Sequence, residues 1–128
     1  MPDDDAFVRE VIETLNSGDV ERRRRLIHPA ARGCAEALAG APLEQALRRQ
    51  AVVQINEDRR WTIRPLNRGQ ALGSSDKVEW AVRPTHSLQI SYQSDARRRR
   101  TLIMQLVADE GRWYEVFACP KPGALPPR

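Results

Sequence analysis

Glu115 has the clearest potential for proton transfer, because it stands among apolar residues in the segment RWYEVFA, residues 112–118. A turn of two or four residues around Glu110 and Gly111 would make it the polar member of an apolar face. The cross-strand pairs would then be Leu106 with Glu115, Met104 with Phe117 and Leu102 with Cys119. Burial there would raise the pKa of Glu115 and suit it to general acid or base catalysis. A three-residue turn would shift the register and leave a surface glutamate.

The two histidines are the other groups that titrate near neutral pH. His86 follows Pro84, where a strand is expected to bend, and it is the second catalytic candidate if it faces a pocket. The alternative is an exposed strand or loop histidine. His28 precedes Pro29 at the predicted end of a helix, where its ring could satisfy the last carbonyl groups.

Two runs of four arginines offer positive charge. Arg22–Arg25 would point around most of a short helix, which predicts a solvated helix whose arginine stems cover apolar surface. Arg97–Arg100 would divide between the two faces of a strand. Arg98 and Arg100 share a face with the apolar residues that follow, so they could hold a carboxylate or phosphate by forked hydrogen bonds. A charged strand end that discourages edge pairing is the alternative.

A ligand pocket would draw its wall from the same half of the chain. The predicted ligand-binding residues are Trp80, Met104, Glu115, Phe117, Arg98 and Arg100. No cofactor is expected, because RGQALGSSDK lacks the Gly-Lys-Ser/Thr ending of a phosphate-binding loop. Cys34 and Cys119 belong to no CxxC or Cys/His cluster, so buried free thiols are expected, with one disulfide as the alternative, and a metal site is not expected.

The bulk composition favours one globular domain. The chain has 128 residues, of which 41% are hydrophobic and 30% charged, which predicts a domain over residues 1–119 and a disordered Pro-rich tail over 120–128. The net charge of +4 rests on 19 Arg against 2 Lys, a skew that often reflects codon usage. Nucleic acid is not an expected partner, because no aromatic platform or known module accompanies the charge. No apolar run approaches the ~20 residues of a membrane span, and the acidic start MPDDD is unlike a signal peptide, so a cytoplasmic protein is expected.

Helices are predicted first along the chain. DDDAFVREVIETLNSGD carries an apolar helical stripe, with Asp5 as N-cap and Gly18 as C-cap. A second helix follows Asp19 and ends near His28, and a third runs from Pro42 to about Ile55.

Strands are predicted from Trp61 onward, where β-branched and alternating runs replace the helical period. They are WTIRPL (61–66), KVEWAVRP continuing into HSLQISYQ (77–93), RRTLIMQLVA (99–108) and RWYEVFA (112–118). Helices followed by an antiparallel meander indicate an α+β fold, with the N-terminal helices packed on one face of a curved antiparallel sheet.

This pattern resembles a known superfamily. LNSGD between the first two helices, LIHP after the second and the terminal GRWYEVFA resemble the nuclear transport factor 2-like superfamily, and within it the SnoaL-like polyketide-cyclase branch, over roughly residues 5–119. The resemblance implies a cone-shaped fold with a pocket between helices and sheet, and often a homodimer through the sheet. It implies no single activity, since the superfamily includes isomerases, dehydratases, cyclases and epoxide hydrolases besides binding and assembly domains.

Three functions follow as hypotheses. The first is a homodimer that binds a small, partly apolar or anionic ligand in a conical pocket. The second is a cofactor-independent isomerase, cyclase or dehydratase in which Glu115 or His86 moves a proton. The third is a protein-interaction module whose pocket is filled by its own side chains.

Overall fold

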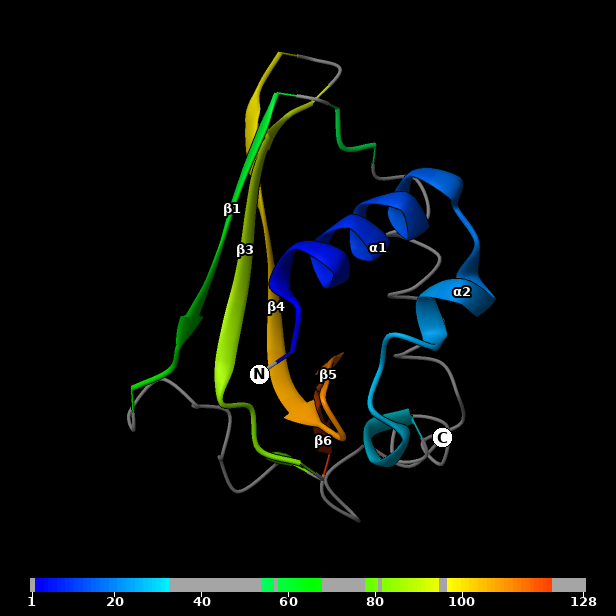
Figure 1. Ribbon diagram of the computed structural model, residues 1–128, viewed down its shortest axis with the longest axis vertical. Coiled ribbons are helices and arrows are strands. Elements are labelled where there is room, and N and C mark those ends of the chain that lie inside the picture. Colours follow the sequence, from blue (N-terminus) through cyan, green and yellow to red (C-terminus); the bar gives the residue numbers. More distant parts are fainter. Residues whose placement is uncertain are drawn as a thin grey trace.

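The computed structural model describes residues 2–32, 54–56, 58–67, 78–80, 82–94 and 97–120. Two helices precede the strands along the chain (Figure 1). The helices are α1 (Asp4–Ser17) and α2 (Val20–Arg24). The strands are β1 (Arg59–Pro65), β2 (Val78–Trp80), β3 (His86–Gln93), β4 (Arg99–Asp109), β5 (Arg112–Glu115) and β6 (Ala118–Pro120). Of the predicted third helix, only residues 54–56 are described. They are not helical, so its predicted end near Ile55 is wrong. The rest of that predicted helix, Cys34 and the tail from residue 121 lie outside the described residues.

Local capping sets the limits of the two helices. Asp3, rather than the predicted Asp5, caps α1, because its carboxylate accepts the amide N–H of Ala6 at 3.0 Å. Gly18 ends α1 with a φ of 70°, as predicted, and Asp19 caps α2. The α2 helix ends at Arg24, earlier than predicted, because the chain then turns to pair with β5.

The main sheet is antiparallel, with the strand order β1-β3-β4-β5. The single long strand predicted over 77–93 is wrong: β2 pairs with β6 in a separate two-stranded sheet, and β3 lies between β1 and β4. Pro84 explains the division, because a proline has no N–H to continue a ladder. Pairing resumes one residue later, where Thr85 N–H donates to the Leu106 carbonyl at 2.8 Å.

The β4–β5 hairpin closes through a two-residue turn, one of the turn lengths that the sequence left open. Glu110 and Gly111 have φ values of 51° and 76°, as a type I′ turn requires. The predicted pair of Leu106 with Glu115 is confirmed. The pairs predicted further along are wrong, because β5 ends at Glu115 and the chain crosses to β2. Pro120, which was expected to begin the tail, is the last residue of β6.

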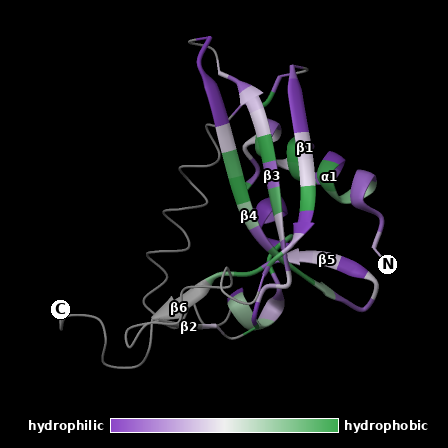
Figure 2. Ribbon diagram, turned by 90° about the vertical axis from the view of Figure 1, so that its left-hand side faces the viewer, coloured by the Kyte–Doolittle hydropathy of each residue, from purple (hydrophilic) through white to green (hydrophobic). Residues whose placement is uncertain are grey.

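The core lies between α1 and one face of the sheet. The apolar stripe of α1 and the inward residues of β3 and β4 are buried in one cluster: Phe7, Val8, Val11, Ile12, Leu15, Leu88, Ile90, Met104 and Leu106. Figure 2 shows the hydrophobic stretches of β1, β3 and β4 side by side along the sheet. Each such side chain contributes about 1.5–3 kcal/mol on burial. The chain therefore has an α+β fold, as predicted, with an open four-stranded antiparallel sheet and α1 and α2 on one side of it (Figure 1). Among the described residues, no helix is long and apolar enough to cross a membrane.

Candidate functional site

The two catalytic candidates lie in one row of the sheet. Leu106 pairs with His86 on one side and with Glu115 on the other, so the three residues belong to the same face. Two strand spacings place His86 and Glu115 about 10 Å apart. The structure therefore brings these two predicted residues together, with an apolar residue between them.

Glu115 is buried and forms an ion pair with Arg23 of α2. Both residues are only 3% exposed, so the prediction that Arg22–Arg25 is a wholly solvated run is wrong for Arg23. Burial raises the pKa of Glu115, as predicted, and the Arg23 guanidinium acts in the opposite direction. Arg23 stands three and four residues before the fully buried Leu26 and Ile27. On the helix predicted to extend to His28, this spacing would have placed Arg23 on their face, although in the structure α2 ends at Arg24.

The backbone of Glu115 holds the segment after α2 against the sheet. Its N–H donates to the Leu26 carbonyl at 2.8 Å, and its carbonyl accepts the N–H of His28 at 2.9 Å. Ile27 and Glu115 thus form a parallel bridge at the edge of β5. The side chain and the backbone of Glu115 therefore hold α2 and the turn that follows it beside β5.

Both histidines have local partners. His86 is half-buried, with Nδ1 at 2.8 Å from Thr85 Oγ1 and its ring edge-on to Trp113 at 4.7 Å. The Nδ1 atom of His28 accepts the Ala30 N–H at 3.1 Å, so its Nε2 carries a proton. This Nε2 donates to Asp109 Oδ2 at 2.7 Å. His28 therefore orders the start of the next turn, and the prediction that it satisfies the preceding carbonyls is wrong.

The other predicted ligand-binding residues are spread over the molecule. Met104 is in the core under α1, and Phe117 packs in a separate cluster with Ile27 and Ala31. Trp80 belongs to the small β2-β6 sheet. Arg98 and Arg100 are exposed at the far end of β4, six to eight residues before Leu106, the first β4 residue that pairs with β5. A strand rise of about 3.4 Å per residue places them roughly 20–27 Å from β5.

A cleft of about 430 Å³ gathers other arginines between α1, α2 and β5. Arg22 and Arg25 come from α2 and its C-cap, Arg32 from the helical residues that begin at Pro29, and Arg112 from β5. Glu10 of α1 and Tyr114 of β5 complete the lining. Four guanidinium groups thus share one cavity with one carboxylate.

The alternation of side chains along β5 explains why Arg112 and Tyr114 both line the cleft. Trp113 and Glu115 are buried on the core side, so Arg112 and Tyr114 share the opposite face. The Arg112 guanidinium lies over the Tyr114 ring at 5.2 Å, and the His28 ring meets the same ring edge-on at 5.4 Å. These contacts hold the aromatic ring in one orientation beside the arginines.

The charges of the cleft are only partly compensated. Arg22 lies 3.1 Å from the exposed Glu13 carboxylate, and Arg32 Nε donates to the Ile27 carbonyl at 2.9 Å. Within the residues that the structure describes, no carboxylate forms an ion pair with Arg25, Arg32 or Arg112. Guanidinium groups that form no ion pair with a protein carboxylate can bind the carboxylate or phosphate of a ligand through forked hydrogen bonds. The cleft can therefore attract and orient a small anion.

In the described part of the chain, no group of His, Cys, Asp and Glu side chains is placed to hold a metal ion. Compared with models of protein families, with curated proteins and with solved structures, the chain matches none. Its own residues therefore carry the functional argument.

Proposed function

We propose that this protein binds a small organic anion, a carboxylate or a phosphate, in the cleft between α1, α2 and β5. The observation that carries the proposal is the convergence of Arg22, Arg25, Arg32 and Arg112 on one cavity with a single opposing carboxylate. The cavity volume of about 430 Å³ lies in the range of small-molecule sites. The anion hypothesis from the sequence is retained, but its site moves from the far end of β4 to β5.

Each part of the cleft has a distinct role in this proposal. Arg25 and Arg112 are exposed and supply the charge that first attracts the anion. Arg32 is fixed at Nε by the Ile27 carbonyl, which leaves its terminal amino groups to bind oxygen atoms at a lower entropic cost. Tyr114 adds a hydroxyl group and a ring of fixed orientation.

The remaining hypotheses receive less support. Proton transfer by Glu115 is disfavoured because this carboxylate faces Arg23 in the core, on the opposite side of β5 from the cleft. Helices on one side of an open antiparallel sheet are compatible with the nuclear transport factor 2-like superfamily, and membership of it stays part of our proposal. The homodimer and the protein-interaction module stay predictions.

Calorimetric titration with citrate and with pyrophosphate at low salt tests the proposal. We expect Arg25→Gln and Arg112→Gln each to weaken binding about ten- to hundredfold, because a hydrogen bond to a charged group contributes about 1.5–3 kcal/mol. Binding should also weaken as salt is raised. The two probes distinguish a carboxylate site from a phosphate site.

Arg60→Gln is the matched control, because it removes the same charge from the exposed side of β1. It should leave both titrations unchanged. No measurable binding of either anion, or an equal loss from all three substitutions, would contradict the proposed site.

A further inference from the structure

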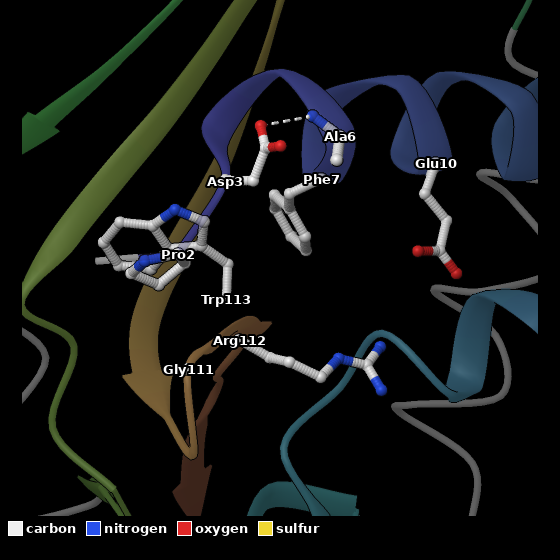
Figure 3. Close-up of a pocket in the computed structure, with 8 residues that line it drawn as sticks. All are labelled: Pro2, Asp3, Ala6, Phe7, Glu10, Gly111, Arg112 and Trp113. Carbon is white, nitrogen blue, oxygen red and sulfur yellow. Dashed lines mark hydrogen bonds between the residues drawn. The ribbon is translucent and has the colours of Figure 1, made fainter.

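A second, smaller pocket opens beside the arginine cleft. It has a volume of about 160 Å³ and lies between the start of α1 and the β4–β5 turn (Figure 3). Glu10 and Arg112 line both cavities, so the two are neighbours. The rest of its lining is mainly apolar and includes Pro2, Ala6, Phe7 and Trp113.

The apolar wall of this pocket is held in place by the core. Phe7 and Trp113 are both largely buried, and Trp113 Nε1 donates to Asp4 Oδ1 at 2.7 Å. The carboxylate of Asp3, which also lines the pocket, accepts the Ala6 N–H. Gly111 leaves room at the turn, because a Cβ atom there would meet nothing within 4 Å. The pocket therefore has two fixed aromatic rings and open space beside them.

The size of the pocket suits one ring. A cavity of about 150 Å³ lined by apolar side chains is large enough to hold benzene. Figure 3 shows the Arg112 side chain running from the turn below Trp113 toward the side of the molecule where Glu10 lies. Arg112 lines both pockets, and its guanidinium group lies over the ring of Tyr114, which lines the cleft.

We infer that the anion bound by this protein carries a single apolar ring of about phenyl size, which enters the small pocket while its phosphate or carboxylate is held by the arginines. The inference rests on the proposed function and specifies its ligand class as an aryl phosphate or aryl carboxylate. Arg112 joins the two parts of the site, because one side chain contacts the ring by its stem and the anion by its guanidinium.

Paired probes separate the ring from the charge. Methyl phosphate is compared with phenyl phosphate, and acetate with phenylacetate, by calorimetric titration of the full chain. We expect the aryl member of at least one pair to bind about ten- to hundredfold more tightly, because burial of a ring adds apolar contact that a methyl group lacks. The pair that shows this preference identifies the anionic group.

Ala6→Leu tests the location of the ring. Ala6 is exposed on the first turn of α1, and leucine is a good helix former, so the variant should fold while its side chain occupies the pocket. In this variant the ratio of the affinity for the aryl probe to the affinity for the methyl probe should fall to about one. Gln89→Leu adds a leucine to the exposed face of β3 and should keep the ratio of the unmodified chain.

The outcomes distinguish this inference from the proposed function. Equal affinities for the methyl and aryl probes, or a preference that survives Ala6→Leu, would overturn the ring pocket and leave the anion cleft intact. No binding of any of the four probes would overturn both.

Discussion

Replacing Arg23 by methionine should lower the free energy of unfolding by about 3–5 kcal/mol at pH 8, because it leaves the Glu115 carboxylate buried without its cation. Methionine retains most of the length and packing of the arginine stem, so the lost charge dominates the effect. Urea denaturation of both proteins, with equal m-values as the check for two-state unfolding, measures the difference.

The loss of unfolding free energy caused by Arg23→Met should shrink as the pH falls from 8 to 5. In the unmodified chain the folded-state pKa of Glu115 is raised by burial, so the folded state holds this proton more tightly and stability declines as pH rises through that raised value. Without Arg23 nothing offsets the burial, the pKa rises further and the decline becomes steeper. At low pH Glu115 is protonated, and the missing cation matters less.

A second variant keeps this prediction specific to the ion pair. Arg23→Met combined with Glu115→Leu removes both charges and should recover most of the lost stability, since apolar pairs replace buried ion pairs at little cost. An equal loss at pH 5 and pH 8, or a double variant no more stable than Arg23→Met, would contradict the account of the pair.

Replacing Trp113 by alanine should cost about 3–5 kcal/mol of stability, because a large buried ring leaves a cavity between α1, β3 and β5. The ring also contacts His86 and donates to Asp4, so α1 and β5 lose a shared anchor. Trp113→Phe keeps a ring but not the N–H donor, and it should cost about 1–2 kcal/mol. Urea denaturation measures both variants, and a loss below about 1 kcal/mol for Trp113→Ala would show that the ring is not part of the core.

Local signals in the sequence predicted much of the fold. Gly18 and Asp19 mark the boundary between the helices because a left-handed C-cap and a carboxylate N-cap act within a few residues. The register of Glu115 follows from the turn at Glu110 and Gly111, which requires two positive φ values. These features depend on neighbouring residues. The sequence predicted the helix boundary, whereas it left the length of the turn, and with it the register of Glu115, open.

Features that depend on distant contacts were missed. The strand over 77–93 looks continuous, but β2 takes its partner from the far end of the chain. The cleft joins Arg25 to Arg112 across 87 positions, and the pairing of Ile27 with Glu115 that brings them together leaves no periodic signal. The alternation in RWYE is compatible with Arg112 and Tyr114 on one face, but the sequence analysis did not predict either residue as part of a site.

An NMR titration with pyrophosphate tests the anion cleft most directly. Two-dimensional spectra that resolve backbone amides and arginine Nε–H groups would be recorded at low salt as the anion is added. The account predicts that the largest shifts occur at Arg22, Arg25, Arg32 and Arg112, with the Tyr114 amide, and that Arg97–Arg100 at the far end of β4 stay unmoved. Shifts centred on Arg97–Arg100, or no shifts at the cleft, would contradict it.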